Sequence, residues 1–222
     1  MRYDNYMTIR KYLHSCLVVE EAGKRLLIDP GDFCFIEGLI KPEDIGPVDG
    51  ILITHKHADH CDVDALRRIL ALRTAPIYTN AEVAAVLAVE GLAATVVKEG
   101  TTFEVANFQV EAVHAPHGQI PAVAPDNTGY LINKKLFHPG DSLDFSIPEG
   151  IELLALPVAA PWLRIVDSLE KAKGVKPKAV LPIHDAFVKD FMRHKLPRLC
   201  QTILEPEGIA VHTLELGESL DI

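Results

Sequence analysis

The sequence predicts an α/β fold in which helices cover mixed β-sheet, and three observations support this prediction. Short apolar runs of strand length recur along the 222 residues. One of them, 50–54, is continuously apolar, which is typical of a strand that is covered on both faces. Helical segments separate several of the runs, whereas others have the spacing of hairpins, so both parallel and antiparallel pairing are expected.

The first part of the chain is predicted to form strands. Apolar runs lie at 9–12, 16–20 and 25–28, and the sequence Glu21-Ala22-Gly23 supplies a turn between the last two. Asp29-Pro30-Gly31 is then expected to end the third strand, because proline and glycine interrupt sheet pairing. The run 50–54 forms the next predicted strand.

Helices are predicted from apolar periodicity and from capping residues. The segment 63–72 places Leu66, Ile69 and Leu70 on one stripe behind an acidic first turn. Asn80 is the expected N-cap of a helix over 81–90, and Gly91 ends it. Further helices are expected at 168–173, ended by Gly174, and at 187–195; further strands are expected at 95–97, 102–105, 108–114, 128–132, 135–138, 151–156 and 179–183.

The composition predicts a single domain over residues 1–222. Hydrophobic residues make up 48 % of the chain and can supply a large core. The 31 Asp and Glu outnumber the 22 Lys and Arg, so a nucleic-acid partner is not expected. The start, MRYDNYMTIR, lacks the apolar segment of a secretory signal, and no run approaches the roughly 18 apolar residues of a membrane span. We therefore expect a cytoplasmic protein without a membrane partner; a homo-oligomer stays an open alternative.

The segment ILITHKHADHC, residues 51–61, carries the strongest functional signal. His55, His57, Asp59 and His60 crowd together where the chain leaves a predicted strand. Desolvating so many imidazole and carboxylate groups together is costly unless a cation binds them. Because Zn²⁺ accepts both ligand types at distances that such a turn can reach, the pattern predicts a metal site.

Three more candidate ligands follow other predicted strands. His117 follows the strand at 108–114, Asp141 follows the strand at 135–138, and His184 follows the strand at 179–183. Ligands delivered from several strand ends are how a rigid sheet assembles a site. Seven candidates exceed the four that one tetrahedral ion needs, so two metal ions at a catalytic site are expected.

In order and spacing these residues resemble the metallo-β-lactamase superfamily. The resemblance rests on His55-Lys56-His57-Ala58-Asp59-His60, His117, Gly140-Asp141 and His184. It implies a four-layer αβ/βα sandwich with two mixed sheets, helices outside, and metals at one edge between the sheets. Leu13-His14-Ser15-Cys16 and the segment 26–30 are similar to the branch that includes ascorbate-6-phosphate lactonase-like hydrolases. Flavo-diiron members carry Glu in place of His57, so iron-based electron transfer is not expected.

The resemblance also implies a role for each ligand. One metal would be held by His55, His57 and His117, and the second by Asp59, His60 and His184, with Asp141 bridging them. Zn²⁺ is the expected metal, with Mn²⁺ and Fe²⁺ as alternatives. Two such ions lower the pKa of a bridging water, so that a hydroxide is available near neutral pH. Asp59 is a candidate for orienting this nucleophile or accepting its proton.

Further residues are candidates for fixing the ligands or binding substrate: His14, Asp29, Thr54, His114, His138 and Trp162. His114 also competes with His117 as the third ligand of the first metal. We favour His117, because His-Ala-Pro-His-Gly resembles the Pro-Gly-His turn of the family. Trp162 is expected either to line the pocket or to pack the core. Substrate specificity is expected to reside in the loops 31–49, 118–127 and 157–165.

The expected activity is hydrolysis of an ester, lactone or phosphodiester bond in a small molecule. An anionic substrate is compatible with this site, because the metals supply positive charge locally. The alternatives are a nuclease or cyclic-nucleotide phosphodiesterase of the same fold, and a non-catalytic metal-binding protein. The full set of seven candidate ligands argues against the non-catalytic alternative.

Overall fold

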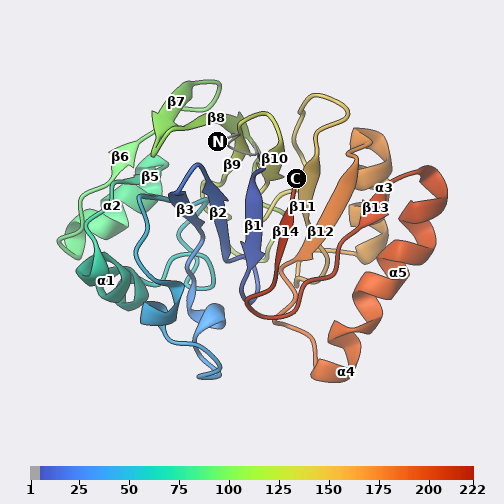
Figure 1. The fold of residues 1–222 in the computed structure, drawn as a ribbon, viewed down its shortest axis with the longest axis horizontal. Helices are drawn as coiled ribbons and strands as arrows, with labels where there is room; N and C mark the ends of the chain where they lie inside the picture. Colours follow the sequence, from blue (N-terminus) through green and yellow to red (C-terminus); the bar gives the residue numbers. More distant parts are fainter. Residues whose placement is uncertain (1–5) are drawn as a thin grey trace.

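Two seven-stranded sheets pack face to face in the structure, a computed structural model that describes residues 6–222 apart from the side chains of residues 190 and 193 (Figure 1). In spatial order the first sheet contains β14 (Ser219–Asp221), β1 (Thr8–Lys11), β2 (Leu17–Glu21), β3 (Lys24–Ile28), β4 (Gly50–Leu52), β5 (Ile77–Thr79) and β6 (Thr95–Val96). The second contains β13 (Ala210–Val211), β12 (Ala179–Ile183), β11 (Leu153–Pro157), β10 (Leu136–His138), β9 (Thr128–Ile132), β8 (Phe108–His114) and β7 (Thr102–Val105).

Both sheets mix the two kinds of pairing, as predicted. In the first sheet, pairing is antiparallel from β14 to β3 and parallel from β3 to β6. In the second sheet it is antiparallel from β7 to β10 and parallel from β10 to β13. The C-terminal strand β14 returns to the first sheet and lies beside β1, so the two ends of the described chain share one sheet (Figure 1).

Helices cover the outer face of each sheet. The helices are α1 (Val63–Leu72), α2 (Ala81–Val89), α3 (Ile165–Val175), α4 (Asp190–Arg193) and α5 (Lys195–Leu204), with 3₁₀ turns η1 (Asp32–Cys34), η2 (Pro42–Ile45) and η3 (Glu205–Glu207). Figure 1 shows α1 and α2 beside the first sheet, and α3 and α5 beside the second. None of the described helices has the length and apolar character that a membrane crossing needs.

Three hydrophobic clusters separate four layers. Ile9 and Leu26 from the first sheet pack against Val110 and Leu153 from the second in the central cluster. A second cluster joins the outer face of the first sheet to α1 and α2, and a third joins the outer face of the second sheet to α3 and α5. Because side chains alternate along a strand, each sheet buries both faces, and the expected four-layer αβ/βα sandwich is confirmed.

The boundaries of α1 match the prediction because local signals determine them. The Asp62 carboxylate accepts hydrogen bonds from the backbone N–H groups of Asp64 and Ala65, which caps the first turn. Leu66 and Ile69 are fully buried on the face toward the first sheet. The chain becomes extended at Arg73, three residues before Pro76.

Two predicted helices differ from the structure. Helix α3 continues through Gly174 and ends at Val175, where Lys176 adopts a left-handed conformation with φ of 51°. The predicted helix over 187–195 is wrong, because the helical turn begins only at Asp190 and a second helix, α5, follows over Lys195–Leu204. Residue 197 is a proline, which the first turn of a helix accommodates because its N–H would have no partner there.

Three strands were not predicted from the sequence: β5, β13 and β14. Each has only two or three residues, which is too short to show an apolar periodicity. Pairing with a longer neighbour makes each of them a strand; β14, for example, pairs antiparallel with β1. Tertiary contacts therefore determine these elements.

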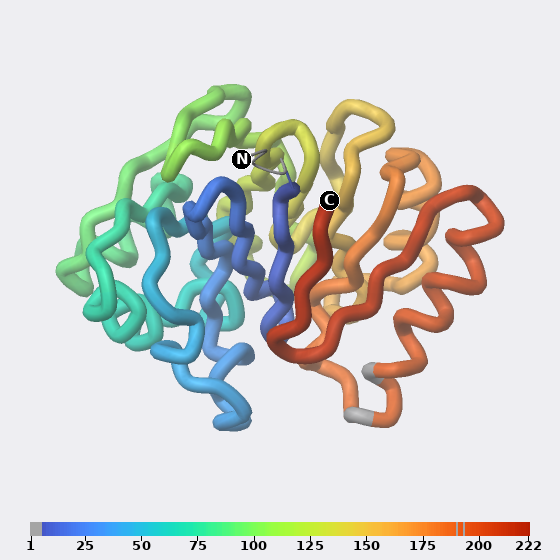
Figure 2. The backbone as a smooth tube through the Cα atoms, viewed as in Figure 1, coloured from blue at the N-terminus to red at the C-terminus, as the bar shows by residue number. Residues whose placement is uncertain are grey.

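The carboxyl ends of several strands meet at one edge of the sandwich. In the first sheet β1, β3 and β4 run in the same direction, and in the second β8, β10, β11 and β12 do so. The segments that follow β3 (blue) and β12 (orange) both extend beyond the strands at the same end of the molecule (Figure 2). Phe33 and Phe187, from these two segments, touch with ring centroids 5.2 Å apart. Residues that follow these strands are thereby brought together.

Candidate metal centre

The seven candidate ligands meet at this edge. Their ligand atoms fall into two groups, each within 4.8 Å of one another: His55, His57, His117 and Asp141 in the first, and His14, Asp59, His60 and His184 in the second. Asp141 also reaches the second group, because its Oδ1 lies 3.0 Å from Nε2 of both His60 and His184. The division is the one implied by the resemblance, with His14 added.

Four buried polar atoms of these ligands have no hydrogen-bond partner among the described residues. They are Nε2 of His60, His117 and His184, and Oδ1 of Asp141. Buried polar atoms are rarely left unpaired in a folded protein. Zinc ligands at bond lengths of about 2.0–2.1 Å in a tetrahedron lie roughly 3.3 Å apart, close to the spacing of these atoms. The imidazole and carboxylate donor set therefore fits a divalent metal ion.

Hydrogen bonds at the far side of three imidazoles determine which nitrogen faces the centre. In each ring Nδ1–H donates to an oxygen that can only accept, which leaves the lone pair of Nε2 for a metal. The acceptors are Asp29 Oδ2 for His60 at 2.7 Å, the Gly118 carbonyl for His117 at 2.6 Å, and the Ala159 carbonyl for His184 at 2.5 Å.

Asp29 connects the first sheet to the ligand turn. Its carboxylate accepts hydrogen bonds from the backbone N–H of Thr54 at 2.8 Å and from the Thr54 hydroxyl at 2.7 Å, besides the bond from His60. Since that hydroxyl donates to Asp29, its oxygen accepts from Nδ1–H of His55 at 3.1 Å. His55 therefore presents Nε2, which lies 3.1 Å from Nδ1 of His57. The structure places Asp29 and Thr54 where ligand-orienting residues were expected.

Charge interactions keep the carboxylates ionised. Burial would raise the pKa of Asp141, but the neighbouring His60 and His184 hold it well below its usual value. Burial likewise opposes ionisation of Asp59, yet the hydrogen bond from His14 and the charge of His60 lower its pKa to about 2. Burial lowers the pKa of both His55 and His57. Burial opposes a charge on His60 as well, but Asp141 and Asp29 raise its pKa well above the usual value. The centre therefore presents ionised carboxylates beside imidazoles, the two ligand types that zinc accepts.

Three residues at the centre have strained backbone conformations. His14, Asp29 and His184 have φ angles of 61°, 47° and 60°, in the left-handed region that non-glycine residues rarely adopt. Such conformations cost about 1 kcal/mol or more each and persist where surrounding contacts impose them. The backbone N–H of His184 donates to the His14 carbonyl at 3.1 Å, so two of these residues hold one another in place.

His14 orients Asp59. Its Nδ1 accepts a hydrogen bond from the backbone N–H of Ala186 at 3.3 Å, so the ring proton lies on Nε2 and points to Asp59 Oδ2 at 3.2 Å. Burial lowers the pKa of His14 to about 4, although the bond to Asp59 opposes this. The neutral ring is therefore a hydrogen-bond donor to Asp59, and the structure places it among the orienting residues.

His14 is expected to contribute a loss of stability to the metal-free protein as the pH falls from about 6.5 to about 4. Unfolded His14 takes up a proton near its ordinary pKa of 6.5, whereas the folded protein resists protonation until about 4. The neutral His14 ring makes its full contribution to the free energy of unfolding above pH 6.5. Between pH 6.5 and pH 4 this contribution falls by about 3 kcal/mol. Urea unfolding of wild type and His14→Gln across this range measures it. Equal pH slopes in the two proteins would contradict the expectation.

Trp162 contacts the proposed bridging ligand directly. Its indole N–H donates to Asp141 Oδ2 at 3.0 Å, and its ring lies 5.9 Å from the ring of His117, centroid to centroid. A β-carbon on Gly118 would lie only 2.1 Å from the indole, so glycine allows the loop after His117 to pack on this ring. Trp162 therefore both lines the site and orients Asp141.

Metal binding is expected to change the fluorescence of Trp162, the only tryptophan of the chain. Because its N–H bonds to a candidate ligand, the Trp162→Phe variant is expected to bind Zn²⁺ about tenfold to a hundredfold more weakly. Titration of the metal-free protein, followed by fluorescence for wild type and by calorimetry for both proteins, measures this. Ile120→Ala, in the same cavity, should retain wild-type affinity; equal weakening in both variants would argue against a specific role of the indole.

Two predicted site residues lie outside the centre. His114 is 70 % exposed and pairs with Glu99 at 2.7 Å, so it is neither the third ligand nor a substrate contact at this site. His138 is fully buried, but both ring nitrogens are engaged: Nε2–H donates to the Ser15 carbonyl and Nδ1 accepts from Gly140. No polar atom of His138 is left to bind substrate. It joins the second sheet to the loop after β1.

A cavity of about 330 Å³ opens onto both ligand groups. Each of the three predicted specificity loops contributes to its lining: Asp32 and Phe33, then Ile120, then Pro161 and Trp162. Asp32, Phe33 and Ile120 were not singled out in the sequence, where only their loops were identified. Phe187 also lines the cavity and was missed, because its segment was assigned to a helix.

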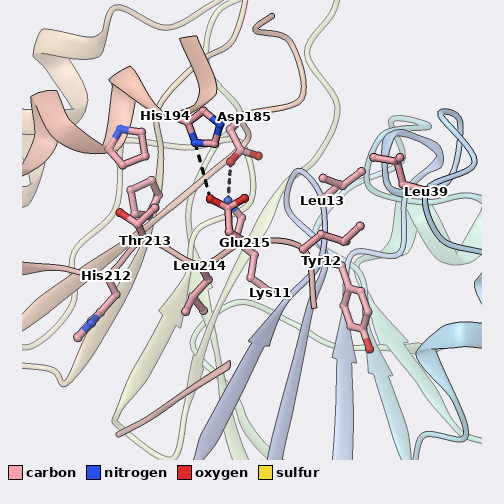
Figure 3. A pocket seen from close by; sticks show the side chains of 13 residues that line it. Lys11, Tyr12, Leu13, Leu39, Asp185, His194, His212, Thr213, Leu214 and Glu215 are labelled. Atoms are coloured by element: carbon pink, nitrogen blue, oxygen red, sulfur yellow. Dashed lines mark hydrogen bonds and ion pairs between the residues drawn. The ribbon is translucent and has the colours of Figure 1, made fainter. Parts of the chain in front are cut away.

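An ion pair anchors the turn that carries His184. Lys11 Nζ lies 2.5 Å from Asp185 Oδ2, and both side chains are largely buried (Figure 3). The pair borders a second cavity of about 230 Å³ that shares no lining residue with the cavity over the ligands. Breaking such a pair is costly, because each charge would be left largely buried without its partner.

The chain matches the model of the β-lactamase superfamily domain over residues 8–184, the segment that contains all seven candidate ligands. It belongs to the metallo-β-lactamase superfamily. A similar relative is the protein Rv0786c of Mycobacterium tuberculosis, 37 % identical over 82 % of this chain and 85 % of its own length. Another, from Thermoplasma acidophilum, is named UPF0173 metal-dependent hydrolase Ta0764 and is 31 % identical over 77 % of this chain and 80 % of its own length.

Solved structures with low sequence identity share the fold. Igni18, described as a metallo hydrolase from Ignicoccus hospitalis, superposes with a TM-score of 0.76 at 22 % identity, covering 98 % of each chain. The metallo-β-lactamase fold protein YhfI of Bacillus subtilis gives a TM-score of 0.71 at 16 % identity, covering 99 % of this chain and 100 % of its own. At these identities the likeness extends to the architecture alone.

Proposed function

We propose that this metallo-β-lactamase superfamily member is a metal-dependent hydrolase that acts on an ester or lactone bond of a small molecule. One observation carries the proposal: four unpaired buried ligand atoms converge beneath a cavity of about 330 Å³. A metal site with protein ligands on one side and a cavity on the other is the arrangement of a catalytic site, whereas a structural site is closed by its ligands. The name of the Thermoplasma relative, a metal-dependent hydrolase, agrees with it.

The residues at the centre fit two divalent metals. His55, His57 and His117 would hold one, Asp59, His60 and His184 the other, and Asp141 would contribute to both. When bound, such ions act as Lewis acids and lower the pKa of water. Zn²⁺ suits this donor set, as do Mn²⁺ and Fe²⁺.

The surrounding side chains would position the reactants. Asp59 is ionised at neutral pH and is held by His14, so it can accept a hydrogen bond from an attacking water. The indole N–H of Trp162 donates to Oδ2 of Asp141, whereas Oδ1 of this carboxylate faces His60 and His184. Phe33, Phe187 and Ile120 would exclude bulk water around a bound substrate, which strengthens electrostatic interactions inside the cavity.

The test combines metal content with a panel of substrates. Purified protein is analysed for metal, stripped with a chelator, and assayed on p-nitrophenyl acetate, a six-membered lactone and bis-p-nitrophenyl phosphate before and after Zn²⁺ or Mn²⁺ is restored. We expect about two ions per chain and metal-dependent cleavage of the ester or the lactone. Absence of metal binding, or cleavage of none of the three after restoration, would overturn the proposal. Cleavage of the phosphodiester alone would favour the phosphodiesterase alternative.

A further inference from the structure

The cavity over the ligand groups has largely aromatic walls. Phe33 and Phe187 meet edge to face with ring centroids 5.2 Å apart, and Trp162 contributes a third ring to the lining. Ile120 and Pro161 add aliphatic surface. Walls of this kind accept an apolar segment of a substrate, and aromatic faces also attract a cation.

The charged residues of the lining are acidic. They are Asp32, Asp59 and Asp141, and no Lys or Arg belongs to the described lining. Two basic residues close in the chain to these elements are engaged elsewhere: Lys11 pairs with Asp185, and Lys56 pairs with Glu82. Asp59 and Asp141 belong to the metal-binding groups, so Asp32 is the acidic side chain of the lining that has no part in them.

Asp32 lines the cavity and has a carboxylate oxygen without a hydrogen-bond partner among the described residues. Its Oδ1 is buried and has no hydrogen-bond partner among the described residues. Its backbone N–H donates to the Ala58 carbonyl at 2.8 Å, which fixes the residue beside the turn that carries the ligands. Burial, followed by the charges of Asp59 and Asp62, raises the pKa of Asp32. Burying an ionised carboxylate without a partner costs free energy, and a bound cationic group would offset that cost.

We propose that Asp32 selects substrates whose acyl part carries a cationic nitrogen next to an apolar segment. The inference rests on the proposed hydrolase function and names its substrate class. The carboxylate of Asp32 attracts the cation, and the rings of Phe33, Phe187 and Trp162 enclose the neighbouring apolar part. An anionic acyl group meets the same carboxylate and is repelled. We therefore expect a cationic acyl group to be preferred over an anionic one.

Three p-nitrophenyl esters of similar acyl length test the proposal: the neutral pentanoate, the anionic glutarate monoester and the cationic 4-(trimethylammonio)butyrate. kcat and KM are measured for metal-loaded wild type and Asp32→Asn, which is nearly isosteric, together with metal content. The control is Asp64→Asn, which removes the same charge from an 88 % exposed side chain in the first turn of α1, outside the lining.

Wild type is expected to prefer the cationic ester, then the neutral one, then the anionic one. In Asp32→Asn the ratio of kcat/KM for cationic over anionic ester should fall at least about tenfold, mainly through KM, because one unit charge is removed at close range. The neutral ester should change less than about twofold, as should all three esters in Asp64→Asn. Metal content should equal that of wild type.

Two failures are distinguishable. If metal-loaded wild type hydrolyses none of the three esters, the proposed hydrolase function fails, and this inference fails with it. If the esters are hydrolysed but the anionic one is preferred, or if Asp32→Asn leaves the charge preference unchanged, the hydrolase function stands and the role of Asp32 is overturned.

Discussion

Replacing Asp141 with asparagine is expected to lower kcat for ester hydrolysis about a thousandfold or more, while the protein stays folded. Oδ1 of Asp141 lies 3.0 Å from both His60 and His184, and its Oδ2 accepts the indole N–H of Trp162. The amide has nearly the same shape, so packing is conserved. It cannot, however, present an anionic oxygen to both ligand groups, so metal content should also fall.

The asparagine side chain of this variant can also form favourable hydrogen bonds in the absence of metal. Its NH₂ group can donate toward the lone pairs of His60 and His184, while its carbonyl oxygen accepts from Trp162. We therefore expect the metal-free variant to unfold at about the same temperature as metal-free wild type. Metal analysis, steady-state kinetics and thermal unfolding, each with and without chelator, measure the three quantities.

The matched control is Asp144→Asn, which makes the same change at an exposed position three residues along the chain. It should retain the metal content and kcat of wild type. If Asp141→Asn kept both as well, Asp141 would not be a ligand. If the variant unfolded at a much lower temperature without metal, its loss of activity would reflect a damaged fold.

Replacing Gly31 with alanine is expected to destabilise the metal-free protein by about 3 kcal/mol or more, a fall in Tm of roughly 10 °C. A β-carbon there would lie 1.8 Å from the backbone oxygen of Asp59 and 2.3 Å from the backbone nitrogen of His60. Neither atom is the end of a flexible side chain, so the two segments must separate.

The separation would disturb the metal ligands as well. Hydrogen bonds from Asp32 N–H to the Ala58 carbonyl, at 2.8 Å, and from Asp62 N–H to the Pro30 carbonyl, at 3.1 Å, hold the segment after β3 against the ligand turn. Moving the two apart displaces Asp29 from His60, whose Nδ1–H it accepts at 2.7 Å. Metal affinity is therefore expected to fall together with stability.

The control is a second glycine-to-alanine substitution, at Gly174, for which we expect stability to rise and not fall. Gly174 lies within α3 and has nothing within 4 Å of an added β-carbon. Gly174→Ala should stabilise the protein by up to about 1 kcal/mol, because alanine favours a helix interior. Thermal and urea unfolding of both variants, with chelator present, measure the contrast. A Gly31→Ala protein as stable as wild type would show that the two segments can separate without cost.

The sequence alone was sufficient to predict the class of fold and to select seven candidate ligands that the structure brings together. Metal ligation requires particular residue types, and four of them lie within six positions after one strand, at His55, His57, Asp59 and His60. Apolar runs such as 102–105, 108–114, 128–132 and 179–183 were long enough to predict strands with the observed boundaries. Both signals are local, because they depend on side-chain chemistry and on the periodicity of a strand.

Tertiary structure alone decided how these residues are used. His117 and His114 are equivalent in residue type, but only His117 turns toward Asp141, whereas His114 points to Glu99 in solvent. The nitrogen that each imidazole presents depends on partners far along the chain, such as Asp29 for His60 and Ala159 for His184. Asp32 and Phe187 line one cavity although 155 positions separate them in the sequence (187 minus 32). Contacts of this kind arise from the packing of two sheets, and no short stretch of sequence encodes that packing.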